Sequence, residues 1–200
     1  LLLGAIAMSV TGCQSSHRPA VEEADRVEVV TTIFPLADMI QCLGGKKVTV
    51  SCLLSAGASP HNFEPTVEQV KKAARAHLFV YMGGGLDDWA TKTAQAGSDR
   101  ICLLNLSEKV VEQNWLPPED ISSVQSEDGS GLTGQFNPHL WLDPLTARDY
   151  LCPALTEALV EADSKNEAYY RTNLTAYQAR LTALDEEIRS DLSGLPRKSF

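Results

Sequence analysis

The chain has 200 residues, of which 44% are hydrophobic, and its formal net charge is −9. This length and apolar content allow one good hydrophobic core and one or two domains. Nucleic-acid binding is excluded as a function class, because phosphate neutralisation needs clustered Lys and Arg and this acidic chain has no basic run.

The N-terminal residues are expected to be a processing signal. Residues 1–10 form an apolar run that is too short to span a bilayer, which takes roughly 20 residues. Val10-Thr11-Gly12-Cys13 follows and resembles the lipobox of bacterial lipoproteins. We therefore expect a signal-peptide remnant over 1–13 with lipidation at Cys13, and a flexible tether over 14–26. The alternative is a frayed apolar N-terminus with a chance cysteine.

Strands and helices alternate over the next 80 residues or so. Apolar, β-branched runs predict strands over 27–32, 47–54, 77–82 and 100–106. Helices are predicted to begin at Phe34-Pro35, after Thr66, where Gln69 completes a capping box, and over 86–96. Gly83-Gly84-Gly85 is interpreted as a tight strand-to-helix turn. Strands that are apolar throughout are typical of a sheet covered on both faces, so we predict an α/β fold with a parallel sheet built from βα repeats.

The second half of the chain is predicted to be mostly helical. A Ser-, Asp- and Gly-rich stretch over 119–135 is expected to be a surface loop. Asp143-Pro144 is a helix start, and Pro153 inside that helix predicts a kink. Ser164 and Glu167 suggest another capping box, followed by a helix of roughly 40 Å. We expect residues 27–163 to form one βα lobe, 164–193 a long linking helix and 194–200 the start of a further lobe, with the chain cut at both ends.

Four cysteines lie after Cys13, at Cys42, Cys52, Cys102 and Cys152. No C-x-x-C is present, which argues against a structural zinc knot. Each cysteine lies in an apolar stretch, so four buried thiols are favoured over disulfides, for which three connectivities are open.

His61 and His139 are the candidate metal ligands. Each follows a proline, Pro60 or Pro138, which stiffens the loop, and His61 lies after the second predicted strand, where parallel sheets bind ligands. Zinc accepts imidazole nitrogen in a tetrahedral site, so two histidines supply only half of the ligands. The alternative is that both Pro-His pairs are ordinary loops.

Several neighbours of the two histidines have weaker assignments. Glu64 is a candidate acceptor that would orient His61, although an exposed glutamate before a turn proline is the simpler reading. Trp141 and Leu142 can supply an apolar wall beside His139. Asp143 is better explained as a helix cap than as a ligand. The other histidines, His17 in the tether and His77 at a strand start, are expected to be structural or solvated.

Enzyme signatures are missing from the sequence. It contains no H-E-x-x-H, no G-x-S-x-G and no phosphate-binding loop. We therefore predict that the protein is not an enzyme. Two alternatives stay open: a zinc hydrolase with an open coordination position, and an adhesin-like structural lipoprotein with incidental Pro-His loops.

Three segments resemble one known family. They are Gly57-Ala-Ser-Pro-His-Asn-Phe-Glu-Pro-Thr66, Gly85-Leu-Asp-Asp-Trp89 and Asn137-Pro-His-Leu-Trp-Leu-Asp-Pro144. They look like the metal-binding lipoproteins of ABC transporters, the cluster A-I solute-binding proteins for zinc and manganese, over about residues 27–200. The resemblance implies two βα lobes joined by a long helix, with His61 and His139 as the ligands of the N-terminal lobe and the other ligands in a C-terminal lobe.

The resemblance also implies a function, a location and partners. Such a protein would capture a divalent metal ion outside the cytoplasm, on the periplasmic or cell-surface side, and deliver it to an ABC permease while a lipid anchors it to the membrane. Imidazole suits zinc, whereas carboxylates favour manganese. Zinc is favoured here and manganese is the alternative, although an acidic Ser/Gly loop stands where many zinc members carry a His-rich one.

Overall fold

The computed structural model describes residues 25–95, 101–112 and 137–195. Within these ranges the chain forms a four-stranded sheet in the order β2-β1-β3-β4, and every neighbouring pair is parallel. The strands are β1 (Val27–Thr31), β2 (Val48–Cys52), β3 (Leu78–Tyr81) and β4 (Cys102–Asn105). The predicted α/β fold with a parallel sheet is confirmed.

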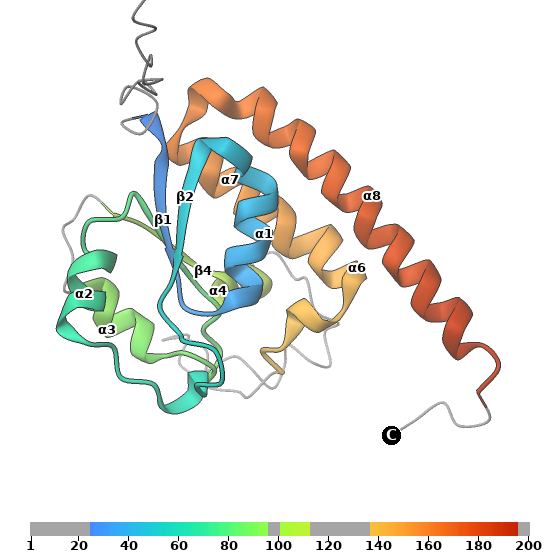
Figure 1. Cartoon of the computed structure of the whole chain (residues 1–200), viewed down its shortest axis with the longest axis horizontal. Helices are drawn as coiled ribbons and strands as arrows, with labels where there is room; N and C mark the ends of the chain where they lie inside the picture. Colours follow the sequence, from blue (N-terminus) through green and yellow to red (C-terminus); the bar gives the residue numbers. More distant parts are fainter. Residues whose placement is uncertain (1–24, 96–100, 113–136, 196–200) are drawn as a thin grey trace, which may run out of the picture.

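Helices cover both faces of the sheet (Figure 1). The α-helices of the described ranges are α1 (Phe34–Gly44), α2 (Val67–Ala73), α3 (Trp89–Gln95), α4 (Leu106–Glu112), α6 (Pro144–Thr146), α7 (Cys152–Ala162) and α8 (Glu167–Leu192). Short 3₁₀ turns are η2 (Gly45–Lys47), η3 (Pro60–Asn62), η4 (Leu140–Leu142) and η6 (Ser164–Asn166), and η5 (Ala147–Leu151) is a π-helical segment. Helices α2 and α3 lie on one side of the sheet, and α1 and α7 lie on the other.

Alternate side chains of the strands enter two separate cores. Val29, Leu78 and Val80 pack with α1, α7 and the start of α8. Val30, Phe79 and Tyr81 point the other way and pack with α2 and α3. This period-two alternation within apolar strands is what a sheet buried on both faces requires.

Helix α1 begins and ends as the sequence predicts, and helix α2 begins at its predicted start. Leu36, Met39, Ile40 and Leu43 are the buried apolar face of α1. The helix stops before Gly45, whose φ is 52°, and a Cβ there would lie 2.4 Å from the Tyr169 hydroxyl. Only glycine fits this position without strain. The capping box that opens α2 is confirmed at both of its hydrogen bonds.

The segment from α6 to α7 is continuous but irregular. The predicted Asp143 cap is confirmed, because its carboxylate accepts from the backbone N–H groups of Leu145 and Thr146. The kink expected at Pro153 stays a prediction; what the structure shows near it is η5, the π-helical segment directly before α7. Proline has no N–H to continue the helical ladder, which accounts for a local change of helix type. The predicted apolar face is buried, at Ala147, Leu151, Leu155 and Leu159.

Helix α8 differs from the prediction at its start. Ser164 does not cap it, because residues 164–166 form η6, and Asn166 at the N-cap makes no side-chain cap hydrogen bond. Asp163 organises this turn instead: its Oδ2 accepts from Asn166 Nδ2 at 2.6 Å and from the Tyr170 hydroxyl at 2.7 Å. The predicted capping box is therefore wrong.

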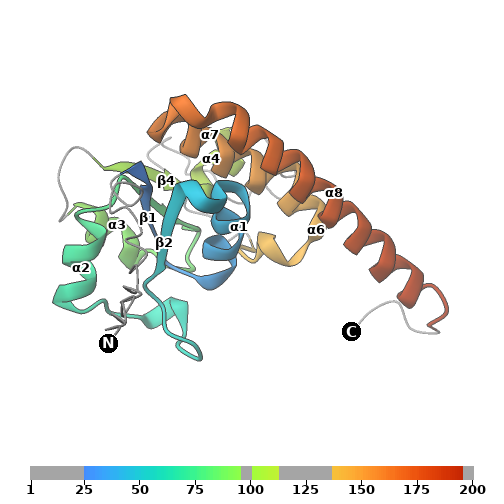
Figure 2. The same cartoon turned by 45° about the horizontal axis from the view of Figure 1, so that its top comes forward.

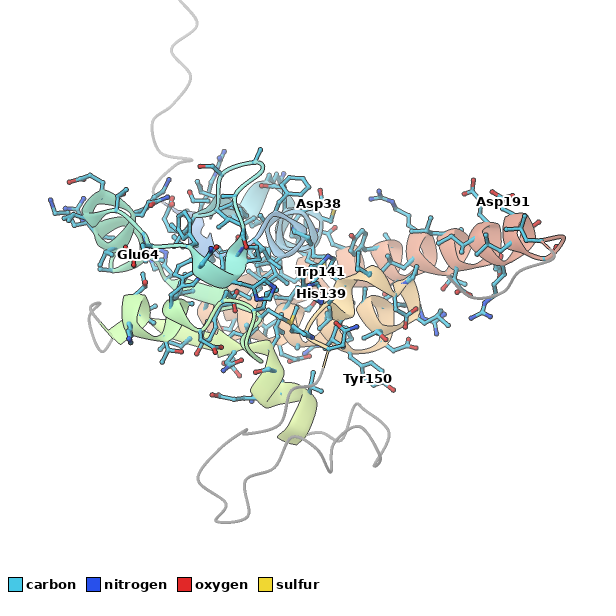
Figure 3. All side chains as sticks on the ribbon, turned by 90° about the horizontal axis from the view of Figure 1, so that it is seen from below. Asp38, Glu64, His139, Trp141, Tyr150 and Asp191 are labelled. Atoms are coloured by element: carbon cyan, nitrogen blue, oxygen red, sulfur yellow. The ribbon has the colours of Figure 1, made fainter. Side chains whose placement is uncertain are left out.

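The second half of α8 extends past the sheet and its covering helices (Figure 2). The 26-residue helix is about 39 Å long. Its predicted apolar face is buried at Leu181 but not beyond: Leu184, Ile188 and Leu192 are 43%, 39% and 47% exposed. Figure 3 shows Asp191 at this far end, well away from the labelled residues of the lobe.

Two features differ from what the sequence predicts. Helix α4 was not predicted, and only Cys152 of the four predicted buried thiols is buried, whereas Cys42, Cys52 and Cys102 are half-buried; all four are free. The loop over 119–135 lies outside the described residues.

None of the helices in the described ranges combines the length and apolar character that crossing a membrane requires.

Candidate metal site

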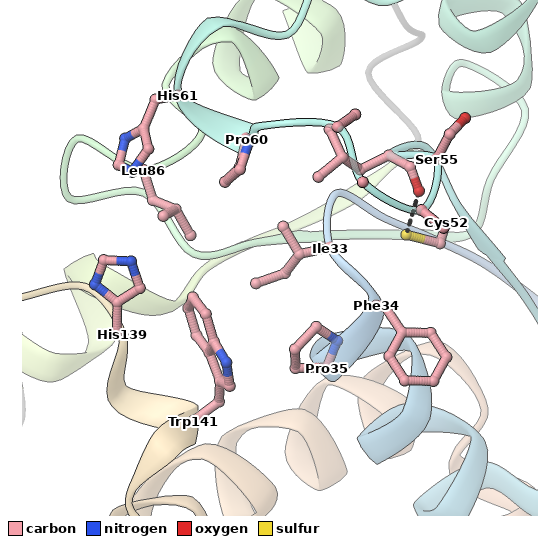
Figure 4. Close-up of a pocket in the computed structure, with 14 residues that line it drawn as sticks. Ile33, Phe34, Pro35, Cys52, Ser55, Pro60, His61, Leu86, His139 and Trp141 are labelled. Carbon is pink, nitrogen blue, oxygen red and sulfur yellow. Dashed lines mark hydrogen bonds between the residues drawn. The ribbon is translucent and has the colours of Figure 1, made fainter.

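His61 and His139 lie together at the carboxyl edge of the sheet. His61 is on η3, in the connection from β2 to α2, and His139 directly precedes η4. Their ring centroids are 6.2 Å apart, and the ring planes are inclined by 56°. Figure 4 shows both imidazoles on the same side of one pocket. Residues 78 positions apart in the sequence thus meet in space.

The His61 loop is held by two contacts besides its own prolines. Pro60 opens η3, and Trp89 Nε1 donates to the Pro60 carbonyl at 2.8 Å. The Trp89 ring also packs against Phe63, with centroids 5.0 Å apart. The imidazole itself is paired through Nδ1, which lies 3.1 Å from the Gly85 carbonyl oxygen.

The His139 loop is held by Asn137 and by the cap of α6. Asn137 Oδ1 accepts from the His139 backbone N–H at 3.1 Å and lies 2.7 Å from His139 Nδ1. Trp141 packs on the ring at a centroid distance of 5.2 Å. Four residues on, burial disfavours ionisation of Asp143, but hydrogen bonds from Thr146 and Leu145 outweigh it and lower the pKa of Asp143.

These contacts define the tautomer of each ring. A carbonyl oxygen only accepts, so His61 Nδ1 must carry the proton that faces Gly85. Asn137 Oδ1 accepts from a backbone N–H, which fixes the amide orientation, so His139 Nδ1 must also be the donor. In the neutral rings the lone pair is then on Nε2 of each histidine. An imidazole fixed through Nδ1–H is the usual arrangement of a histidine that binds metal through Nε2.

The separation of the rings suits one shared ion after a small adjustment. Two imidazoles on one tetrahedral zinc, with N–Zn bonds of about 2.0–2.1 Å, have centroids about 5 Å apart. The observed 6.2 Å exceeds this by roughly 1 Å, which side-chain rotation can close. Within the described ranges no group of three or more His, Cys, Asp and Glu side chains is placed to hold a metal ion.

The pocket beside the two rings has a volume of about 470 Å³ and is mostly apolar. Ile33, Leu86 and Trp141 contribute to its wall, and Cys52 lies on the side away from the histidines (Figure 4). The Cys52 thiol contacts the carbonyl oxygens of Thr32 and Leu54, and burial raises its pKa. A protonated thiol paired in this way is a poor metal ligand.

The other predicted residues lie elsewhere. Glu64 lines a separate pocket between α2 and α3, and Figure 3 shows it apart from His139 and Trp141. Leu142 is 72% exposed and does not line the pocket, so the apolar wall comes from Trp141. His77 is structural, since its Nδ1 accepts from the Glu28 backbone N–H at 2.9 Å. Cys13 and His17 lie outside the described residues.

Reasoning from the sequence missed two groups that bear on the site. Asn137 orients His139, and its place two residues before the histidine was the available signal, because Asn side chains accept from the backbone two residues on. The Gly85 carbonyl orients His61 from another loop, and backbone contacts of this kind leave no signal in side-chain patterns.

Comparison with known proteins gives a consistent family match. A family model described as the periplasmic component A of the zinc-uptake complex, ZnuA, matches residues 29–200. The manganese ABC transporter substrate-binding lipoprotein PsaA of Streptococcus pneumoniae is 30% identical over 201 residues, which cover 98% of this chain and 59% of PsaA. The iron ABC transporter substrate-binding lipoprotein MtsA of Streptococcus pyogenes serotype M1 is 29% identical, over 98% of this chain and 61% of MtsA.

A solved structure agrees with these matches. The Zn(II)-bound ZnuA-like domain of Streptococcus pneumoniae AdcA is similar with a TM-score of 0.70 and 25% identity, over 88% of this chain and 59% of that one. The chain therefore spans about three fifths of the length of the curated relatives it matches. The names of the relatives specify manganese, iron and zinc, so similarity alone does not select the metal.

Proposed function

Because the chain belongs to the ZnuA family of metal-binding substrate-binding proteins of ABC transporters, we propose that it captures a divalent metal ion, zinc by preference, through His61 and His139. The ion is then delivered to an ABC permease. The observation that carries the proposal is the pairing of the two rings at 6.2 Å, with each Nδ1 hydrogen-bonded and each Nε2 left for an ion.

Zinc is preferred because both donors are neutral imidazoles, which suit zinc better than they suit manganese. Manganese is the alternative, since PsaA is named for manganese and the AdcA domain is Zn(II)-bound. The relatives are substrate-binding proteins rather than enzymes, so the hydrolase alternative is set aside.

The proposal extends to the organisation of the protein. Residues 27–163 would form the N-terminal lobe, 164–193 the linking helix and 194–200 the start of the second lobe. That second lobe would provide the remaining ligands. The relatives are named lipoproteins, which supports lipidation of Cys13 as the anchor that keeps the protein at the outer face of a membrane.

Calorimetry on the full-length protein with zinc, manganese and iron(II) tests the site. His61→Ala and His139→Ala should each weaken zinc binding by at least about 100-fold, since even an outer-shell partner of a metal ligand is worth about 10- to 100-fold. His77→Gln, which keeps an acceptor for the Glu28 N–H, is the control and should bind as wild type does. Unchanged affinity in both alanine variants would show that the ligands are wrongly assigned.

A second measurement uses residues 1–200 alone. With two imidazoles as the proposed ligands, this chain should bind zinc only weakly. Nanomolar binding by it would contradict the proposal that the ligand set is shared with another lobe.

A further inference from the structure

Asp87 is a buried carboxylate beside the candidate site with no part in the proposed ligand set. Its side chain is fully buried, at 0% exposure. Three donors converge on it: Oδ2 accepts from the Thr32 hydroxyl at 2.5 Å and from the Met82 N–H at 3.1 Å, and Oδ1 accepts from the Gly83 N–H at 2.6 Å. Burying a carboxylate is costly, and here it also raises the pKa of Asp87. Because burial of the Asp87 carboxylate is unfavourable, its hydrogen bonds indicate a structural role.

The backbone that Asp87 holds is the turn Gly83-Gly84-Gly85. All three residues have positive φ angles, of 70°, 61° and 86°. Three consecutive glycines lose more conformational freedom on folding than any other tripeptide, so the turn needs external bonds to adopt one shape. Asp87 fixes its first N–H, and Asp88 Oδ1 accepts from its last, the Gly85 N–H, at 3.1 Å.

The far end of this turn touches the candidate ligand. The Gly85 carbonyl accepts from His61 Nδ1 at 3.1 Å, and this bond places the proton on Nδ1 and the lone pair on Nε2. His61 itself lies on η3 and is exposed. The carbonyl that orients its ring belongs to a different loop, the glycine turn. A chain of bonds thus runs from Thr32, at the end of β1, through Asp87 and the glycine turn to the imidazole.

We propose that Asp87 is a positioning residue for metal capture: it fixes the glycine turn so that the Gly85 carbonyl holds His61 with Nε2 directed to the ion shared with His139. The inference rests on the proposed function. Asp87 touches no metal and acts through the backbone of the turn.

The test compares Asp87→Asn with Asp88→Asn in the full-length protein. Both changes remove one negative charge near the site. An amide at position 87 cannot satisfy donors on both of its sides, because its NH₂ would face either Gly83 or the Thr32–Met82 pair. An amide at position 88 still offers its one needed oxygen to the Gly85 N–H.

Two measurements separate positioning from charge. Zinc affinity is measured by calorimetry, and the tautomer of His61 in the metal-free protein is measured from long-range ¹H–¹⁵N correlations of its ring. Asp87→Asn should bind zinc about 10- to 100-fold more weakly, the range for an outer-shell partner, and should lose the fixed Nδ1-protonated pattern. Asp88→Asn should keep both. Equal weakening in the two variants, or an unchanged His61 pattern in Asp87→Asn, would overturn the proposal.

A glycine variant keeps the proposal testable if Asp87→Asn does not fold. Gly85 has φ of 86°, and a Cβ there would meet nothing within 4 Å, so Gly85→Ala strains the backbone without a steric clash. Because Gly85 carries the carbonyl that faces His61, Gly85→Ala should weaken zinc binding and lose the fixed Nδ1-protonated pattern of His61. Wild-type affinity with the wild-type His61 pattern in Gly85→Ala would refute the positioning role.

His61→Ala distinguishes the two levels of the argument. If that variant binds zinc as wild type does, the proposed function fails. If it weakens binding while Asp87→Asn retains wild-type affinity and the wild-type tautomer, only the positioning role of Asp87 fails.

Discussion

The hydroxyl of Tyr170, in the first turn of α8, is hydrogen-bonded to Asp163, which directly follows α7. The loss of this bond should lower the free energy of unfolding by an amount that can be worked out from its geometry. Tyr170 is fully buried, and its hydroxyl donates at 2.7 Å to Asp163, which is only 8% exposed. Hydrogen bonds to charged groups are worth about 1.5–3 kcal/mol. Asp163 Oδ2 keeps a second donor in Asn166 after the change, so Tyr170→Phe should cost about 2 kcal/mol of the free energy of unfolding.

The neighbouring Tyr169 supplies a matched control. Its hydroxyl accepts a long 3.5 Å bond from the Lys46 N–H, and its side chain is only half-buried, so Tyr169→Phe should cost no more than about 0.5 kcal/mol. For a chain of this size a loss of about 2 kcal/mol lowers the melting temperature by about 4–8 °C. Urea and thermal unfolding at pH 7 measure both variants.

The pH dependence of the same bond has a definite sign. Burial and the hydrogen bond to Asp163 raise the pKa of Tyr170. A phenol whose pKa is raised by folding stabilises the protein fully below its ordinary pKa near 10 and loses that contribution as the pH rises through the folded value. The difference between wild type and Tyr170→Phe should therefore be constant from pH 6 to 9 and shrink above it. Equal losses in the Tyr170 and Tyr169 variants would refute the reasoning.

Three further predictions concern other parts of the lobe. Burial raises the pKa of the Cys152 thiol to about 12 from its ordinary 9.0, so mass spectrometry after iodoacetamide treatment at pH 8 should find it unlabelled in the folded protein and labelled in urea; labelling at equal rates would contradict this. Thr66→Ala removes the cap of α2 and should cost about 1 kcal/mol in urea unfolding, whereas Thr66→Ser should keep it. Trp89→Phe keeps the ring contact with Phe63 but loses the bond to the Pro60 carbonyl, so calorimetry should show zinc affinity reduced by up to about tenfold; no change would show that the His61 loop does not depend on that bond.

The sheet and its main helices could be predicted because their signals are local. Apolar, β-branched runs mark the strands, and the Thr66–Gln69 box and the Asp143 cap mark helix starts with side chains only a few residues apart. Helix α4 had such a signal too. Asn105 Oδ1 accepts from the Ser107 N–H, but Asn105 ends an apolar strand, and the strand pattern masked the cap.

Long-range features could not be predicted in the same way. The bond from His61 to the Gly85 carbonyl and the burial of Asp87 depend on how separate loops meet at the sheet edge. The periodic leucines of α8 identify an apolar face, but periodicity does not say what covers it, and the structure buries that face at Leu181 and exposes it at Leu184. The pairing of His61 with His139 could be predicted only in part. Parallel topology brings the loops at the carboxyl ends of the strands to one edge of the sheet, but it does not fix the distance between two side chains in them.

The packing of α1 has a consequence for how the chain folds. Its apolar face is covered by α7 and α8, which follow only after residues 45–151 have been added. The sheet is entirely parallel, so its strand pairs also join distant segments. Loops of this length must close before their contacts stabilise anything, which slows folding. We expect a chain emerging in order to leave this lobe unfolded until α8 has been made, because only then can the apolar face of α1 be fully covered.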